Sequence, residues 1–248
     1  MTNKQSSYLG SSALEAVEHT LRSNTSVEFQ DGYIDTLGGA PRPGIRRDQA
    51  MFRSRILPPI YERAWRPAIS RLFFGKGLTE AEERRIVLEM LAIAPGERVL
   101  DVGCGTGNYT RHLAEAAGSG LTVGIDASKA MVSAAAKRGG GSNLAYLRGD
   151  ACDLPFPDGE FEVVCSVGVI HMIAEPMKAL AEMVRVLAPG GRLALVVSCE
   201  EDAIPFMKKQ VTTFGRDELT GALRDAGLSD IGQRVIHRGQ FVVGKKRT

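Results

Sequence analysis

The chain has 248 residues, of which 44% are hydrophobic and 24% charged, and its formal net charge at pH 7 is +2. This length allows a sizeable buried core, and no apolar run approaches the roughly 18 residues of a membrane-spanning helix. The small net charge gives no indication of nucleic-acid binding. The opening residues, MTNKQSSYLGSS, lack the apolar segment of a secretory signal.

Cysteine and histidine spacing argues against metal and disulfide chemistry. The four cysteines form no C-x-x-C pair, and the four histidines show no metal-ligand spacing. We therefore expect reduced thiols, no metal site and a cytoplasmic protein.

The sequence divides into two regions that differ in composition and in hydrophobic pattern. Residues 1–77 are irregular and rich in arginine, whereas residues 78–248 alternate helical and strand patterns, so the sequence predicts an N-terminal cap or lid and one α/β domain. Ser12 and Glu15 form a capping-box pattern ahead of an apolar helical stripe. A second helix is predicted over 59–74, where Tyr61 and Trp65 could line an acceptor pocket or simply anchor the cap. The arginines could bind an acidic substrate or RNA, or form a solvated helix face.

The second region begins with a helix, since Thr79 and Glu82 form a capping box ahead of apolar residues that end before Pro95. Five strands are predicted at 98–103, 121–126, 144–150, 161–170 and 191–198, and helical segments follow the first, second and fourth. Their near-continuous apolar character is typical of a parallel sheet covered on both faces. Right-handed crossovers would make it doubly wound.

The C-terminal part departs from this alternation. A helix over 216–226 stops at Gly227, and strands at 231–238 and 240–246 are too close for a crossover, so they must be antiparallel. The expected fold is therefore α/β, a doubly wound, seven-stranded, mostly parallel sheet that ends in an antiparallel hairpin and carries an N-terminal helical cap.

The stretch VLDVGCGTGNYTRHL at 99–113 predicts a strand, a glycine-rich turn and a helix. A dinucleotide fingerprint needs G-x-G-x-x-G, but here Gly103, Gly105 and Gly107 are spaced G-x-G-x-G. The carboxylate of Asp101 is unhelpful to a pyrophosphate and suits a ligand with an ammonium group. The loop therefore favours S-adenosylmethionine (AdoMet) over NAD.

Two further carboxylates follow strands. Asp126 ends the second strand, where it can accept hydrogen bonds from both ribose hydroxyls of either cofactor, or merely cap the helix near Ser128. Asp150 ends the third strand, where it can accept from an adenine amine while the Ala151 amide donates to a ring nitrogen. The alternative is that Asp150 is an ordinary turn residue.

Together these stretches resemble the class I AdoMet-dependent methyltransferases, specifically the methyltransferase type 11 or UbiE-like group, over about residues 80–200. The resemblance implies a Rossmann-like methyltransferase fold and in-line transfer of a methyl group from AdoMet to oxygen, carbon or nitrogen of a lipid, quinone or secondary metabolite. It assigns the cofactor site to Asp101, Gly103, Cys104, Gly105, Gly107, Asp126, Ala127, Met131, Asp150, Ala151 and Val167.

His171 is the candidate catalytic residue, because it follows the fourth strand at the edge where ligands bind in open α/β sheets. It could act as a general base or only line the pocket. Three other functions stay open. The chain could be an RNA methyltransferase, although the usual cysteine-rich zinc segment is absent, or an NAD(P)-dependent oxidoreductase, although no Y-x-x-x-K pair appears. It could also be a non-catalytic partner protein that binds AdoMet. The acceptor and the oligomeric state are not indicated.

Overall fold

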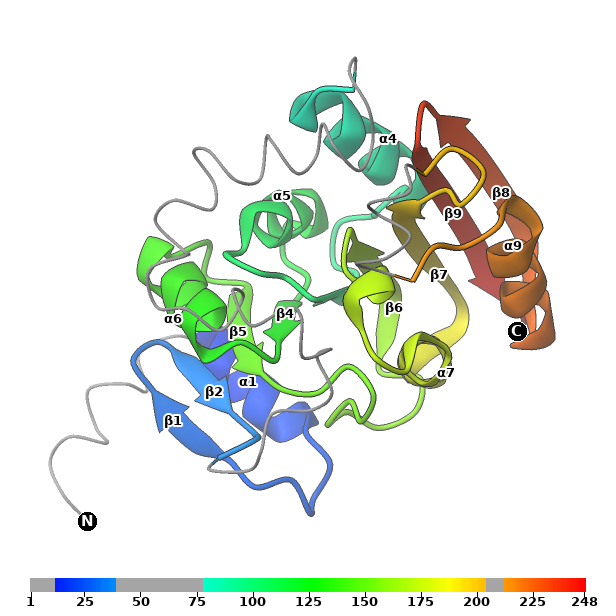
Figure 1. The fold of residues 1–248 in the computed structure, drawn as a ribbon. Helices are drawn as coiled ribbons and strands as arrows, with labels where there is room; N and C mark the ends of the chain where they lie inside the picture. Colours follow the sequence, from blue (N-terminus) through cyan, green and yellow to red (C-terminus); the bar gives the residue numbers. More distant parts are fainter. Residues whose placement is uncertain (1–11, 39–77, 204–211) are drawn as a thin grey trace, which may run out of the picture.

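The computed structural model describes residues 12–38, 78–203 and 212–248. Within these ranges the chain builds one nine-stranded sheet in the order β1-β2-β5-β4-β3-β6-β7-β9-β8 (Figure 1). The helix expected over 59–74, with Tyr61 and Trp65, lies outside the described residues. Among the helices within them, none is long and apolar enough to cross a bilayer.

The elements follow the expected alternation from Thr79 onward. The helices are α1 (Ser12–Thr20), α4 (Glu80–Leu91), α5 (Asn108–Ala117), α6 (Lys129–Arg138), the 3-10 turn η4 (Ile170–Met172), α7 (Pro176–Val186) and α9 (Arg216–Asp225). The strands are β1 (Glu28–Gln30), β2 (Tyr33–Asp35), β3 (Val99–Val102), β4 (Thr122–Asp126), β5 (Leu144–Arg148), β6 (Phe161–Val167), β7 (Leu187–Ser198), β8 (Leu228–Ile236) and β9 (Gly239–Lys246).

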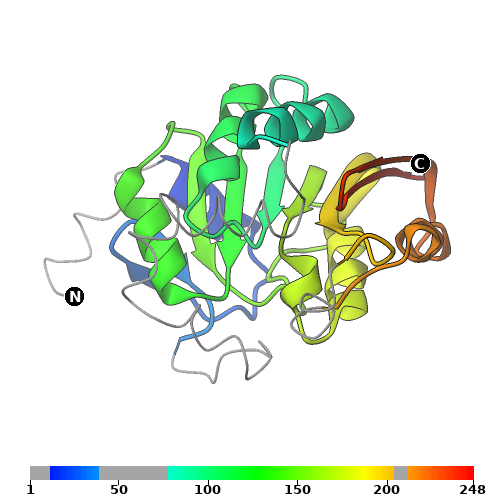
Figure 2. The same ribbon diagram turned by 45° about the horizontal axis from the view of Figure 1, so that its top comes forward.

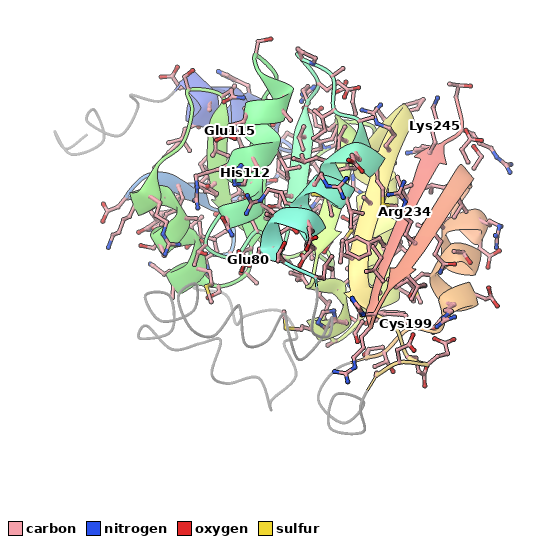
Figure 3. All side chains as sticks on the ribbon, turned by 90° about the horizontal axis from the view of Figure 1, so that it is seen from above. Glu80, His112, Glu115, Cys199, Arg234 and Lys245 are labelled. Carbon is pink, nitrogen blue, oxygen red and sulfur yellow. The ribbon has the colours of Figure 1, made fainter. Side chains whose placement is uncertain are left out.

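Helices cover the sheet on both faces, as the apolar strands predict (Figure 2). On one face α4, α5 and α6 pack their apolar sides against alternate strand residues such as Val99, Cys165 and Tyr146. On the other face α1, α7 and α9 pack over Leu100, Ile125 and their neighbours. Figure 3 looks onto the first face, with Glu80 on α4 and His112 and Glu115 on α5.

The strand order reverses at β3, which pairs in parallel with β4 on one side and β6 on the other. Such a reversal leaves a crevice at the carboxyl ends of the strands, because the two following loops diverge there. This confirms the doubly wound prediction and marks the edge where a site is expected.

The C-terminal hairpin is also confirmed, since β8 and β9 pair antiparallel and β9 pairs antiparallel with β7. The expected start of the fifth strand is wrong. β7 begins at Leu187 rather than at 191, because Leu187 already pairs with Phe161 and the Pro189–Gly191 turn is a register shift within the strand.

The predicted strand count of seven is too low, because the N-terminal region supplies two strands of the same sheet. β1 and β2 form a hairpin closed by Asp31 and Gly32, and β2 pairs in parallel with β5. Each strand has only three residues, so its structure depends on the neighbouring strand rather than on its own pattern. Tyr33 is buried in the core beside Tyr146, so it anchors this region to the sheet.

Candidate cofactor-binding site

Residues from four separate stretches of the chain meet at the carboxyl edge of the parallel strands. The turns after β3, β4, β5 and β6 lie side by side because these strands are parallel neighbours. Most of the residues assigned to the cofactor are partly exposed there: Gly103, Gly105, Asp126, Ala127, Asp150, Ala151 and Val167. Four others are buried: Asp101, Cys104, Gly107 and Met131.

The glycine loop is held down on the neighbouring strand. The amides of Gly103 and Cys104 both donate to the carbonyl of Ile125, at 2.7 and 3.0 Å. Gly103 has φ +81°, and a Cβ there would lie 2.3 Å from Cγ1 of Val169. This glycine is therefore required both by its left-handed backbone and by the close passage of the turn after β6.

Gly105 is the point where the loop opens outward. It has φ +54°, and a Cβ there would meet no atom within 4 Å. Its amide donates to Oδ2 of Asp126 at 3.0 Å, while the Ser128 amide donates to Oδ1 at 2.8 Å. Asp126 thus fixes its own helix and the glycine loop, and each oxygen keeps a lone pair for a further donor. Burial raises the pKa of this carboxyl, and its two backbone hydrogen bonds oppose that shift.

Asp101 braces the loop from below. Its side chain is 2% exposed, and it accepts from the Thr110 hydroxyl at 2.7 Å and from the Cys165 thiol at 3.8 Å. The carboxylate expected to meet a ligand's ammonium group therefore also ties β3 to the first turn of α5. The sequence did not predict Thr110, because its hydroxyl reaches Asp101 only once α5 packs against β3.

Two arginines support the outer part of the loop and were also missed. Arg111 and Arg138 both donate from Nη1 to the carbonyl of Thr106, at 3.2 and 3.3 Å. Arg111 follows the loop on α5 and Arg138 ends α6, so their meeting depends on helix packing that no local pattern reveals.

Burial and the nearby Asp126 raise the pKa of the Cys104 thiol well above its ordinary value, so this cysteine is protonated.

Asp150 shapes the turn after β5. Its Oδ1 accepts from the Cys152 amide at 2.8 Å, which leaves Oδ2 as an acceptor for a further donor. Burial raises the pKa of this carboxyl. Arg185 stiffens the rest of the loop, because its Nη2 donates to the Leu154 carbonyl and its Nη1 to the Phe156 carbonyl, at 3.0 and 2.8 Å.

His171 lies on η4, which follows β6 at the same edge, and it is 3% exposed. The Thr212 amide donates to its carbonyl at 3.0 Å. Burial lowers the pKa of the imidazole to about 4, so the ring is neutral near pH 7. A neutral imidazole can accept a proton or hydrogen-bond a ligand, but it is a weaker base than an exposed histidine.

The arrangement has the chemistry of a nucleoside site. Asp126 and Asp150 present acceptors at the ends of neighbouring strands, and the Ala151 amide lies between the second carboxylate and the rest of its turn. Gly107, in the left-handed conformation, is the N-cap residue of α5, and no side chain caps this end of the helix. Met131 is buried in the first turn of α6, close in sequence to Asp126.

The fold is a Rossmann-like sheet with acceptor side chains at the carboxyl edge of its parallel strands. A sequence model of the methyltransferase domain family matches residues 100–195, which span β3 to β7. The chain is 30% identical over 181 residues to a demethylmenaquinone methyltransferase of Geobacillus sp., covering 60% of this chain and 77% of that protein. The chain belongs to the class I AdoMet-dependent methyltransferases, in the methyltransferase type 11 or UbiE-like group.

Two further comparisons agree with this family. The ubiquinone/menaquinone biosynthesis C-methyltransferase UbiE of Ectopseudomonas mendocina is 35% identical over 136 residues, 53% of each chain. The crystal structure of a SAM-dependent methyltransferase from Aquifex aeolicus superposes with a TM-score of 0.60 at 26% identity, covering 76% of this chain and 97% of that one. This chain spans about half the length of several of the curated relatives it matches.

Proposed function

We propose that this chain binds AdoMet at the carboxyl edge of the sheet and transfers its methyl group to a small-molecule acceptor. The observation that carries the proposal is the position of Asp126. Its carboxylate is fixed by the Gly105 and Ser128 amides, and it lies beside the open side of Gly105 with lone pairs to spare. A rigid acceptor next to an accessible glycine loop suits a ribose.

The residues at this edge divide among the parts of the cofactor. Asp126 would hold the ribose, Asp150 and Ala151 the adenine edge, and Met131 one adenine face. The glycine loop from Asp101 to Gly107 would lie under the methionine part, with Cys104, Ala127 and Val167 completing the walls. Bound AdoMet supplies a methyl group on a cationic sulfonium, and the protein's part is to align the acceptor and exclude water.

For the acceptor, we infer a quinol or a related lipid or secondary metabolite. The relatives named above are demethylmenaquinone and ubiquinone/menaquinone methyltransferases, which supports a reduced quinone as the first acceptor to test. Methylation at carbon follows those names, and oxygen and nitrogen are the other sites to assay. Tyr61 and Trp65 stay predicted acceptor contacts, and His171 stays the candidate base.

Calorimetric titration with S-adenosylhomocysteine (SAH), the product form of the cofactor, tests the proposal. We expect binding in the micromolar range, weakened at least about tenfold by Asp126→Ala, since a lost charge-assisted hydrogen bond costs roughly 1.5–3 kcal/mol. Glu115→Gln is the matched control, because Glu115 is exposed on the outer side of α5 (Figure 3) and its loss should leave the affinity unchanged.

The same titration separates the competing functions. NAD(H) binding more tightly than SAH would indicate an oxidoreductase and overturn the proposal. With SAH bound, incubation with methyl-labelled AdoMet and either a short-chain demethylmenaquinol or RNA should label the small molecule. Labelled RNA instead, with binding that weakens steeply as salt rises, would show that the acceptor class is wrong.

A further inference from the structure

A buried ion pair joins the N-terminal region to the middle of the sheet. Nη1 of Arg148 on β5 lies 2.8 Å from Oδ2 and 3.0 Å from Oδ1 of Asp35 on β2. The two side chains are 6% and 2% exposed. Removing both charges from water is costly, and the attraction offsets that cost only when further hydrogen bonds satisfy the remaining polar atoms. The partners of those remaining polar atoms therefore show which segments of the chain the ion pair connects.

The remaining hydrogen bonds of the pair run in two directions. Toward the N-terminal region, Oδ1 of Asp35 accepts from the amides of Leu37 and Gly38, and Arg148 donates from Nη1 to the Gly38 carbonyl at 3.1 Å. Toward the sheet, Arg148 donates from Nε to the carbonyl of Ala127 at 3.3 Å. One guanidinium thus ties residues 35–38 to the turn after β4.

Strand register places this connection at the nucleoside site. Asp35 pairs with Arg148 across β2 and β5, and Arg148 pairs with Asp126 across β5 and β4. The three residues form one row at the carboxyl edge, and Ala127 directly follows the carboxylate proposed for the ribose. The turn that carries Asp126 therefore receives a hydrogen bond whose other end is fixed by the N-terminal strand.

The turn proposed for adenine is contacted from the same region. The backbone amide of Arg22 donates to the Pro155 carbonyl at 2.9 Å, and the guanidinium of Arg22 pairs with Asp153 at 2.6 Å. An exposed pair of this kind adds little stability, but it shows that the two segments lie together. Residues 22, 24–26, 36 and 37 line one side of an open cavity of about 380 Å³, and Asp150, Asp153 and Pro155 line the other.

We propose that Asp35 and Arg148 are positioning residues for the nucleoside half of the cofactor site, which makes the segment 12–38 part of that site. The inference rests on the proposed function, since it takes the nucleoside to lie at Asp126 and Asp150. The pair acts through the Ala127 turn and touches no reacting atom. Because coupling between two sites is reciprocal, nucleoside binding must also stabilise the β2–β5 pairing.

The test uses the full chain with the ion pair replaced by apolar residues. Asp35→Leu/Arg148→Met removes both charges together, so that no lone buried charge remains to unfold the protein. We expect circular dichroism to show a folded sheet and calorimetry to show SAH affinity reduced about tenfold, within the usual range of coupling between sites. Arg148→Lys should bind SAH with intermediate affinity, because lysine keeps the charge but lacks the planar guanidinium group that hydrogen-bonds both Asp35 and the Ala127 carbonyl.

A matched control pair lies at the opposite edge of the sheet. Arg192, which follows the Pro189–Gly191 turn within β7, pairs with Glu97, which precedes β3. Glu97→Gln/Arg192→Met should lower stability and leave SAH affinity unchanged. If this control loses affinity as much as the Asp35/Arg148 double variant, or if that double variant binds SAH like the wild type, the positioning role is wrong. Failure of the wild type itself to bind SAH would instead contradict the proposed function.

Hydrogen exchange and kinetics supply two further readouts, and the split between KM and kcat is the one that a purely structural pair would not change. The Thr36 amide donates to the Arg148 carbonyl at 3.0 Å, and its exchange in wild-type protein should slow when SAH is added. In a turnover assay, Arg148→Lys should raise KM for AdoMet with little change in kcat, since it alters positioning rather than chemistry. Unchanged Thr36 exchange with saturating SAH would overturn the coupling.

Discussion

At the scale of single residues, the glycines of the loop are under different constraints. Gly103 and Gly105 both have positive φ, at +81° and +54°. A Cβ on Gly103 would strike Val169, whereas a Cβ on Gly105 would enter open space. The first glycine is therefore needed for folding, and the second leaves room at the surface where the cofactor is proposed to lie.

Alanine substitutions should separate these two roles. Left-handed backbone costs alanine about 1–2 kcal/mol, so Gly105→Ala should lower the free energy of unfolding by about that much and weaken SAH binding. Gly103→Ala adds the clash and should cost about 2–4 kcal/mol in all. Urea unfolding measures both. Adding Val169→Ala to Gly103→Ala should recover part of the loss, and equal losses for the two single variants would contradict the steric argument.

His171 should make stability depend on pH. Its folded pKa of about 4 is below the ordinary 6.5, so between these values the unfolded chain binds the extra proton and the folded chain does not. The stabilisation is therefore present above pH 6.5 and is lost as pH falls toward 4. From pH 7 to 4.5, wild-type protein should lose about 2–3 kcal/mol more than His171→Gln. Parallel loss in both proteins would show that the imidazole is not held neutral.

At the scale of elements, a lysine of β9, a strand far along the sequence, caps the C-terminal end of α7. Nζ of Lys246 on β9 donates to the carbonyls of Val184 and Leu187, at 2.7 and 2.6 Å. These are the orphan carbonyls that a helix end leaves unpaired, and a cation there also interacts favourably with the helix dipole. Burial lowers the pKa of this ammonium. The lysine thus fastens the last turn of α7 to the C-terminal hairpin.

Removing that ammonium should destabilise the protein. We expect Lys246→Met to lower the free energy of unfolding by about 1–2 kcal/mol. Lys245→Met, at the exposed neighbouring position (Figure 3), should change it by less than about 0.5 kcal/mol. A comparable loss from both substitutions, measured by urea unfolding, would mean that net charge rather than the helix end is responsible.

Elements with local signals were predicted well. The helix after Thr79 begins with the expected capping box, in which the Thr79 hydroxyl accepts from the Glu82 amide. The helix before Gly227 ends as expected, with that glycine at φ +89°. Both features depend on side chains within a few residues of the helix end, so the sequence contains all the information needed to place them.

Elements that depend on distant partners were not predicted. The sequence did not predict β1 and β2, because a strand of three residues is too short to show the alternation of apolar and polar residues that marks a strand. The Asp31-Gly32 dipeptide between them is nevertheless a strong hairpin signal. At the site, the positions of Asp126 and Asp150 followed from strand ends. The partners Thr110, Arg138 and Arg148 did not, since each meets its carboxylate or carbonyl only through tertiary packing.

At the scale of the whole molecule, the proposed site is built from turns of four strands and from the N-terminal region, so its occupation should stabilise the entire fold. A ligand present at 100 times its Kd stabilises the native state by about 2.7 kcal/mol. For a chain of this size we expect SAH at that concentration to raise Tm by about 5–10 °C. Glu115→Gln should show the same rise and Asp126→Ala a smaller one, and an equal rise in both would place the ligand elsewhere.

The pairing of β2 with β5 also has a consequence for synthesis. Asp35 and Arg148 are 113 residues apart, and at about 5–20 residues per second the partner strand is made roughly 6–23 s after the hairpin. During that interval Tyr33 and Ile34, which are 2% and 0% exposed in the finished sheet, have only β1 beside them and lack β5 on the other side. We therefore expect nascent chains that end before Arg148 to engage chaperones through these two side chains, and longer chains to release them.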